Sequence, residues 1–202
     1  MRALIMAGGA GSRLNRGEKP ILSICGRPMI EYVVTAFQQA GCEPVVAASS
    51  RTPMTQNWCR ANNISLCNTE GNGFIEDMVY AIHALEEENP IFITVSDIPG
   101  ITPGIIKSIL KSYGECNKEA LSTWIPATMV RSCRGGMPYR EPIEGIEACP
   151  VGINILRGDH IHKPQDEFAL LLHEPCLALN VNTRDDLTFA ETFLKNADLN
   201  ES

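Results

Sequence analysis

The sequence predicts a single-domain α/β fold in which a mostly parallel, twisted sheet is flanked by helices. Short apolar runs alternate with segments of helical periodicity through the first hundred residues. A glycine-rich turn directly follows the first apolar run, as happens where a buried strand passes into a ligand-binding loop. The chain has 202 residues, 44% of them hydrophobic, which is enough for one core around one sheet. We therefore treat residues 1–202 as one domain.

The first half of the chain is typical of a βαβ series. We expect strands at residues 3–7, 45–49, 64–68 and 91–96, and helices near residues 30–40, 55–61 and 74–87. The apolar positions of the first and third helices each fall on one helical face. Because crossover helices pack on the sheet they connect, ligands should bind at the carboxyl ends of these strands.

The second half is less regular. A further helix should begin at Thr102-Pro103, which has the form of an N-cap followed by proline, and strands are expected at residues 121–125, 151–156 and 177–181. Residues 126–150 are rich in proline and glycine, so we expect an insertion or an acceptor-binding loop there. The last helix should begin at Thr183, with Asp186 completing a capping box.

Composition excludes several classes of function. The net charge is −7 and the 17 basic residues form no run, which argues against a nucleic-acid partner. No apolar run approaches the roughly 20 residues that span a bilayer, and the N-terminus lacks the features of a secretory leader, so we expect no membrane role and a cytoplasmic location. The eight cysteines lack metal-site spacing and favour buried free thiols, although a hyperthermophilic source would allow disulfides.

The most informative motif is the glycine loop Gly8-Gly9-Ala10-Gly11-Ser12-Arg13, because glycines let backbone N–H groups approach phosphate oxygens. A Walker loop would need a lysine that the motif lacks, and a dinucleotide fingerprint would need glycine where Leu14 stands. What remains is a phosphate cradle with two cations, Arg13 and the Lys19 of Lys19-Pro20. An ordinary glycine-rich turn with surface charges is the alternative.

Two polar residues stand where strands meet the same edge. Asp97 follows the apolar run 91–96, and a carboxylate there suits Mg²⁺, but it suits a turn before Ile98-Pro99 equally well. Asn182 precedes the last helix, where a carboxamide oxygen could join a metal or simply belong to the loop before the N-cap.

Glycines recur in two further places. The turn after the third strand contains Thr69, Gly71 and Gly73, which would permit close approach of a ligand, and Ser49 and Ser50 are weaker candidates of the same kind. For Glu76 and Asp77 we favour the ordinary role of acidic residues in the first turn of a helix. Gly152 and Asn154 could shape a cleft, and close packing of a buried strand explains the glycine equally well.

These motifs together resemble a known family. Residues 4–13, Lys19-Pro20 and Gly26-Arg27-Pro28-Met29-Ile30 are similar to the start of the Rossmann-like nucleotidyltransferases that include sugar-phosphate and molybdenum-cofactor members. The resemblance implies that Arg13 and Lys19 hold the triphosphate of an NTP, and that Asp97 and Asn182 hold Mg²⁺. It also implies that the turn around Gly71 contacts base and ribose.

Residues 71–78, 150–154 and 180–187 resemble more narrowly the archaeal GTP:adenosylcobinamide-phosphate guanylyltransferases. The implied reaction transfers GMP from GTP to adenosylcobinamide phosphate and releases pyrophosphate. The implied catalytic residues are Arg13, Lys19 and Asp97, with Mg²⁺ as cofactor. The implied nucleotide-binding residues are Ala7, Gly8, Gly9, Gly11, Ser12, Arg13, Lys19, Thr69, Gly71, Gly73 and Gly152.

Two other functions remain open from the sequence. A molybdenum-cofactor guanylyltransferase, or another small NTP transferase, would use the same front half of the chain. A nucleotide-binding sensor without transfer activity would use the same cradle, although Asp97 together with Lys19 argues against simple binding. The oligomeric state is also open, with a homodimer as one option.

Overall fold

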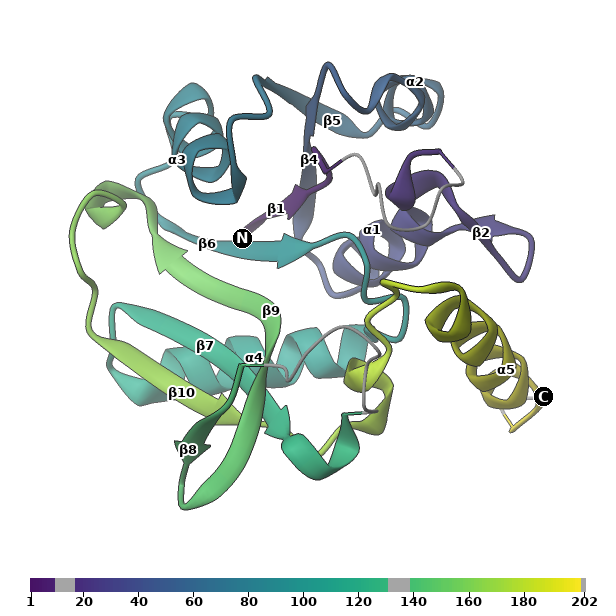
Figure 1. Ribbon diagram of the computed structural model, residues 1–202. Coiled ribbons are helices and arrows are strands. Elements are labelled where there is room, and N and C mark those ends of the chain that lie inside the picture. Colours follow the sequence, from purple (N-terminus) through teal and green to yellow (C-terminus); the bar gives the residue numbers. More distant parts are fainter. Residues whose placement is uncertain (10–16, 131–138, 201–202) are drawn as a thin grey trace.

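The computed structural model describes residues 1–9, 17–130 and 139–200, and in it a central sheet separates two layers of helices (Figure 1). Within these residues the sheet has eight strands in the order β10-β7-β9-β6-β1-β4-β5, with β8 paired to β9. It is a mixed sheet in which β9 runs antiparallel to both of its long neighbours. The structure confirms the predicted single-domain α/β fold.

The parallel part of the sheet is the part that the sequence predicts best. β1 lies between β4 and β6, and β5 follows β4 at the sheet edge, with every one of these pairs parallel. Their carboxyl ends therefore meet at one edge. The strand bounds are β1 Arg2–Met6, β4 Glu43–Ser49, β5 Ser65–Thr69 and β6 Pro90–Val95.

The two faces of the sheet are covered by different helices. Alternate residues of β1 divide between two apolar clusters: Ala3 and Ile5 pack on the side of α1, α2 and α4, whereas Leu4 and Met6 pack on the side of α3. The helix bounds are α1 Met29–Gln39, α2 Pro53–Ala61, α3 Phe74–Ala84 and α4 Pro103–Cys116. Each predicted crossover helix is thus present, and α3 ends three residues earlier than expected.

Local signals explain where α4 begins. The side chain of Thr102 accepts a hydrogen bond from the Ile105 backbone N–H at 3.3 Å, and Pro103 occupies the first turn. The seven cysteines in the described residues are free thiols, as favoured from the sequence. Burial raises the pKa of the Cys59 thiol, on the inner face of α2, to about 11.

One expected strand is wrong. Residues 177–181 do not join the sheet: Pro175–Ala178 form a short 3₁₀ helix, η4, and the edge strand is instead β10, Glu167–Leu171, which pairs in parallel with β7, Ala120–Pro126. The reason is that the segment packs on the turn after β6. The Cys176 carbonyl lies against the bare Cα of Gly100, and the Val181 backbone N–H donates to the Asp97 carbonyl at 3.1 Å.

Residues 126–150, expected to form an insertion or an acceptor-binding loop, contain regular elements within the described residues, while their role stays a prediction. The 3₁₀ helix η2 covers Ala127–Met129, β8 covers Glu141–Ile143 and β9 covers Ile146–Arg157. The last two form a hairpin whose turn, Glu144-Gly145, has φ values of 52° and 80°. Positive φ at both positions matches the right-handed strand twist, and a Glu-Gly turn carries a weaker sequence signal than Asn-Gly.

The C-terminal helix α5, Arg184–Asn200, packs away from the main sheet and beside a small ribbon, β2 Ser23–Ile24 with β3 Arg27–Pro28 (Figure 1). Leu187 and Ala190 of α5 pack against Ile24 and Met29. Among the described residues, no helix is both long enough and apolar enough to cross a membrane. The remaining 3₁₀ helices are η1 Lys19–Ile21 and η3 Gly158–His160.

Candidate functional site

A cleft of about 400 Å³ opens where β1, β4, β5 and β6 reach their carboxyl ends. Its two ends differ in kind. Lys19, Asp97 and Asn182 line one end, which we call the charged end. Glycine-rich turns line the other, which we call the loop end and which includes Gly8, Gly71, Gly73 and Asp77.

At the charged end, the Lys19 ammonium lies between two oxygen acceptors. It forms an ion pair with Asp97 Oδ2 and donates a hydrogen bond to Asn182 Oδ1 at 2.8 Å. The side chains of Lys19 and Asp97 are only 15% and 16% exposed, so solvent screens their attraction weakly. The site thus gathers residues that are 78 and 163 positions apart from Lys19 in the sequence.

Glu18 fixes the backbone from which Lys19 projects. Its carboxylate accepts hydrogen bonds from the backbone N–H groups of Met54 and Thr55, at 2.6 and 2.7 Å, and from the Thr55 hydroxyl at 2.7 Å. These N–H groups belong to the first turn of α2, whose own N-cap residue Thr52 makes no side-chain cap. Glu18 therefore caps α2 from a distance and holds the start of η1 against it.

Asp97 stands one residue beyond Ser96 at the end of β6, and only one of its two oxygens is paired. Oδ2 faces Lys19, whereas Oδ1 is buried with no hydrogen-bond partner in the part of the chain that the structure describes. A buried carboxylate oxygen without a donor is unfavourable unless a ligand supplies one. Oδ1 is thus the free acceptor of the charged end.

Asn182 is held by the cap of α5. Asp186 Oδ2 accepts the backbone N–H groups of Asn182 and Thr183 at 3.0 and 2.7 Å, while the Thr183 hydroxyl accepts the Asp186 N–H at 3.2 Å. This reciprocal pair is the predicted capping box. The Asn182 amide nitrogen donates to Asn180 Oδ1 at 2.6 Å, which turns its oxygen toward Lys19.

Ser49 connects the turns of the loop end. Its fully buried hydroxyl donates to the Gly8 carbonyl at 3.0 Å and accepts the Arg51 backbone N–H at 3.2 Å. Gly71 packs directly on it, because a Cβ on Gly71 would lie 3.1 Å from the Ser49 hydroxyl oxygen. With φ at +78°, Gly71 also has a conformation that other residues adopt only with strain.

Asp77 organises the turn between β5 and α3. The side chain is only 7% exposed, and Oδ1 accepts the backbone N–H groups of Gly71 and Asn72 at 3.0 and 3.3 Å. No donor among the described residues reaches Oδ2, near which a Cβ on Gly8 would lie at 3.5 Å. From the sequence we expected Asp77 only to stabilise the first turn of α3. The carboxylate also holds the turn before α3 and lines the cleft.

Most of the sequence-predicted site residues line this one cleft, although their roles remain predictions. From the first strand and its loop come Ala7, Gly8 and Gly9; the others are Lys19, Gly71, Gly73, Asp97 and Asn182. Gly11, Ser12 and Arg13 lie outside the described residues.

Two predicted residues do not line the cleft. Thr69 is 7% exposed and its hydroxyl has no partner within the residues described. Gly152 lies beneath Val95: its φ is +86°, and a Cβ there would lie 3.1 Å from a methyl group of Val95, which does line the cleft. Gly152 therefore packs closely on a strand residue, as in the alternative that the sequence left open, and its role in nucleotide binding stays a prediction.

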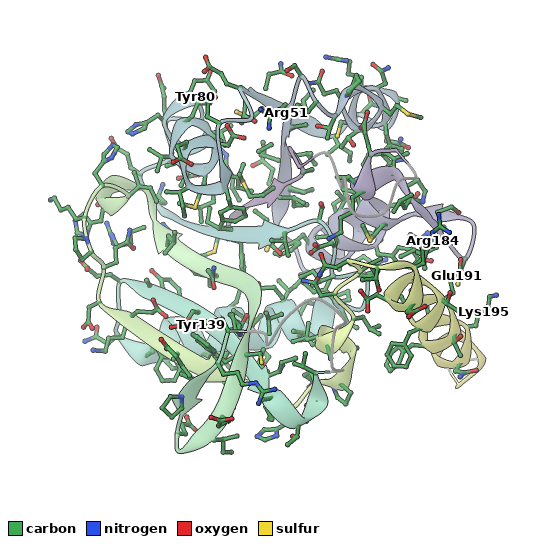
Figure 2. The ribbon with its side chains drawn as sticks, viewed as in Figure 1. Arg51, Tyr80, Tyr139, Arg184, Glu191 and Lys195 are labelled. Atoms are coloured by element: carbon green, nitrogen blue, oxygen red, sulfur yellow. The ribbon has the colours of Figure 1, made fainter. Side chains whose placement is uncertain are left out.

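Sequence reasoning missed Arg51, Phe74 and Ser96, all of which line the cleft. Arg51 follows β4 and lies beside the turn before α3 (Figure 2). Its position after the strand-ending Ser49-Ser50 pair was the available signal, since polar residues at a parallel strand's carboxyl end tend to face ligands. Phe74 is 46% exposed. This exposure was not predicted, because Phe74 stands at the start of an apolar helical pattern.

Chemically, the cleft can hold an extended anion at one end and a flat group at the other. The charged end offers an ammonium and a free carboxylate oxygen, a combination that suits phosphates and a hard cation. The loop end offers bare glycine backbone and a carboxylate acceptor, which suits a group with N–H donors.

Comparisons with known proteins identify relatives that act on nucleotides, in agreement with a cleft that can hold phosphates. The sequence pattern of the MobA-like NTP transferase domain matches residues 3–178. The adenosylcobinamide-phosphate guanylyltransferase of Methanocaldococcus jannaschii is 35% identical over an alignment of 208 positions, gaps included, which covers 96% of this chain and 98% of that protein. A 3-deoxy-manno-octulosonate cytidylyltransferase of Actinobacillus pleuropneumoniae is 32% identical over an alignment of 117 positions, gaps included, which covers 56% of this chain and 46% of that protein.

Among solved structures, a CMP:2-keto-3-deoxy-manno-octonic acid synthetase complexed with CTP aligns with a TM-score of 0.71. The match covers 97% of this chain and 98% of that one at 18% identity. At this identity the likeness concerns the fold alone. It extends over the parallel strands and the irregular second half alike.

Proposed function

Because this chain belongs to the MobA-like NTP transferase family, we propose that it transfers GMP from GTP to adenosylcobinamide phosphate, giving adenosylcobinamide-GDP and pyrophosphate. The observation that carries the proposal is the charged end of the cleft, where Lys19 lies between Asp97 and Asn182 beside a glycine-lined loop end. The identity to the Methanocaldococcus jannaschii enzyme, which extends over nearly the whole chain, supports the choice of acceptor.

The reaction is an in-line displacement at phosphorus. An oxygen of the acceptor phosphate forms a bond to the α-phosphorus of GTP, and the bond from that phosphorus to the bridging oxygen of the β-phosphate breaks. The nucleophile is already an anion, so no general base is needed. Lys19 would stabilise the negative charge that develops on the departing pyrophosphate, and the cleft would hold the two phosphates in line.

The charged end also fits the Mg²⁺ expected from the sequence. Asp97 Oδ1 is a buried acceptor without a partner among the described residues, and Asn182 Oδ1 faces the same ammonium as Asp97 Oδ2. Magnesium is commonly held by one or two carboxylates together with substrate phosphates, so Asp97 and Asn182 would supply its protein ligands. When bound, the ion would neutralise phosphate charge.

Three expectations complete the proposal. Arg13, outside the described residues, would add a planar donor to the triphosphate grip. The chain would come from an archaeon, as the sequence resemblance implies, and would act in the cytoplasm, as expected from its composition. A homodimer remains one option for its assembly.

Pyrophosphate release tests the proposal. Purified protein is supplied with each of the four NTPs and Mg²⁺, and with adenosylcobinamide phosphate, molybdopterin or no acceptor. We expect release only with GTP and adenosylcobinamide phosphate together. Release with molybdopterin would instead assign a molybdenum-cofactor guanylyltransferase, and tight GTP binding with no acceptor-dependent release would assign a nucleotide sensor.

A matched pair of lysine variants connects the activity to the cleft. Lys19→Ala should lower turnover by about 10²- to 10³-fold, because it removes a donor aimed at developing charge. Lys111→Ala removes an exposed lysine of α4 that forms an ion pair with Glu115 on the same helix, and should leave turnover unchanged. Circular dichroism checks that both variants fold, and unchanged turnover in Lys19→Ala would exclude the proposed role.

A further inference from the structure

We propose that Asp77 selects the base: its Oδ2 accepts hydrogen bonds from the ring N–H and the exocyclic amino group of guanine, so that the loop end discriminates guanine from the other bases. This inference rests on the proposed function, since it assumes that the cleft holds a nucleoside triphosphate. It adds the residue that sets base preference, for which the glycine turns alone give no physical reason.

The direction of the nucleotide follows from the charges. Lys19 is the basic residue at the charged end, and the free oxygen of Asp97 lies beside it. A triphosphate held there leaves the nucleoside to extend toward the loop end, because Gly8, Gly71 and Asp77 line the rest of the same cleft. The base therefore comes to rest among backbone groups and the Asp77 carboxylate.

The hydrogen-bond pattern of Asp77 leaves one oxygen for a ligand. Oδ1 already accepts two backbone N–H groups, from Gly71 and Asn72. Oδ2 has no donor within the described residues, although the side chain is 7% exposed and lines the cleft. Oδ2 is not among the buried oxygens of the described residues that lack a partner, so it is open to the cleft, and a ligand that enters the cleft can donate to it in place of water.

The surroundings of Oδ2 suit a flat ring. Gly8 stands close to it, since a Cβ on Gly8 would lie only 3.5 Å from this oxygen. Gly71 lies beside it, held by Oδ1. Phe74 adds an apolar ring that is 46% exposed where it borders the cleft. Bare backbone at Gly8 lets an aromatic base approach Oδ2 to contact distance, and a side chain there would obstruct it, whereas a side chain on Gly71 would point at Ser49.

Guanine is the base whose donors match a carboxylate. Its ring N1–H and its C2 amino group are adjacent donors, so the two lone pairs of one carboxylate oxygen, Oδ2, can accept from both. Adenine and cytosine each have an amino donor next to a ring nitrogen that carries a lone pair. That lone pair and the carboxylate oxygen repel each other. Uracil presents one N–H between two carbonyl oxygens, which are also repelled. Charge and geometry therefore favour GTP.

The test measures dissociation constants by calorimetry, in the presence of Mg²⁺, for GTP, ITP and XTP. ITP lacks the C2 amino group, and XTP carries a carbonyl oxygen in its place. Wild-type protein should bind GTP about 10- to 100-fold more tightly than ITP, because a hydrogen bond to a charged acceptor is lost, and XTP more weakly still. Equal affinities for GTP and ITP would overturn the proposal without any variant.

Asp77→Asn provides the second arm. The amide oxygen can keep the bonds to Gly71 and Asn72, while its NH₂ group replaces the acceptor that faces the cleft. We expect the ratio of GTP to XTP affinity to fall by at least about 10-fold, as XTP gains a donor for its C2 oxygen. If Asp77 serves only to shape the turn, all three nucleotides lose affinity equally and the ratio stays fixed, which contradicts the proposal.

Glu76→Gln is the matched control, since it makes the same carboxylate-to-amide change at an exposed position one residue earlier. Its nucleotide ratios should equal those of the wild type. Failure of this inference is separable from failure of the proposed function. Wild-type protein that does not bind GTP removes the proposed function, whereas protein that binds GTP without distinguishing ITP removes only the role of Asp77.

Discussion

The two ends of the cleft are built by different means. The charged end is assembled from three side chains that are far apart in the sequence, and its contacts are an ion pair and a hydrogen bond to Lys19. The loop end is assembled mainly from backbone: Ser49 and Asp77 bind main-chain groups of neighbouring turns, and glycines supply the space.

The difference teaches that charge and shape are separable in this site. Replacing a polar group at the charged end changes the field around the phosphates and leaves the turns in place, so turnover should fall while base preference persists. Replacing a group at the loop end moves backbone, so nucleotide affinity and selectivity should change first. Each of the following variants tests that division.

The largest effect is expected from Asp97→Asn. The substitution keeps an oxygen near Lys19 but removes the negative charge, and the lost oxygen, Oδ1, has no partner among the described residues. Turnover should fall by about 10²- to 10³-fold, and the thermal midpoint should fall as well, because Lys19 loses its partner in a weakly screened ion pair. Stopped assays of pyrophosphate release and calorimetric unfolding measure the two effects. A changed preference between GTP and ITP in this variant would break the comparison.

Gly71→Ala should have an intermediate effect, on affinity. The new Cβ meets Ser49 at 3.1 Å in a backbone conformation with φ of +78°, so the turn must shift. We expect GTP affinity to fall by about 10-fold, equivalent to about 1.4 kcal/mol, with a smaller change in turnover at saturation. Fluorescence titration with a labelled GTP measures the affinity.

Gly145→Ala is the control for Gly71→Ala. It imposes a similar strain, with φ of +80°, but nothing lies within 4 Å of the new Cβ and the residue belongs to the β8–β9 turn. It should lower stability and leave GTP affinity intact. If both variants lose affinity alike, backbone strain rather than the contact with Ser49 is responsible.

The smallest effect is expected from Glu18→Gln, which acts on the charged end through the backbone. The amide can accept only at one oxygen, so one of the bonds to Met54 or Thr55 is lost and the cap of α2 weakens by about 1 kcal/mol. The thermal midpoint should fall by a few degrees, with turnover reduced several-fold as Lys19 loses its support. Glu115→Gln, at an exposed site on α4, should change neither quantity.

Local signals account for the parts of the fold that the sequence predicts. The apolar periods of α1 and α3, the Thr102 cap and the Thr183 capping box lie within a few residues of the structures they specify. The sequence predicted a strand at residues 177–181 instead of at β10, because both segments are short and apolar. What separates them is a distant contact, the packing of the Cys176 carbonyl on Gly100, which no local pattern encodes.

The same distinction holds within the site. Lys19 and Asp97 stand next to recognisable motifs, so their presence in one cleft could be predicted from chain order and sheet topology. The capping of α2 by Glu18 spans 36 positions and has no local signature. The dual use of the Asp77 carboxylate was hidden because a simpler explanation, an acid in the first turn of a helix, already accounted for the residue.

The capping box before α5 has a consequence for the order in which the protein is made. Synthesis runs from the N-terminus, and a chain that has emerged through β10 already contains every strand of the sheet described here. It still lacks Asn182, which arrives with the cap of α5 and the bond from Val181 to Asp97. The cleft therefore receives its last lining residue, Asn182, only after every strand of the described sheet has been synthesised.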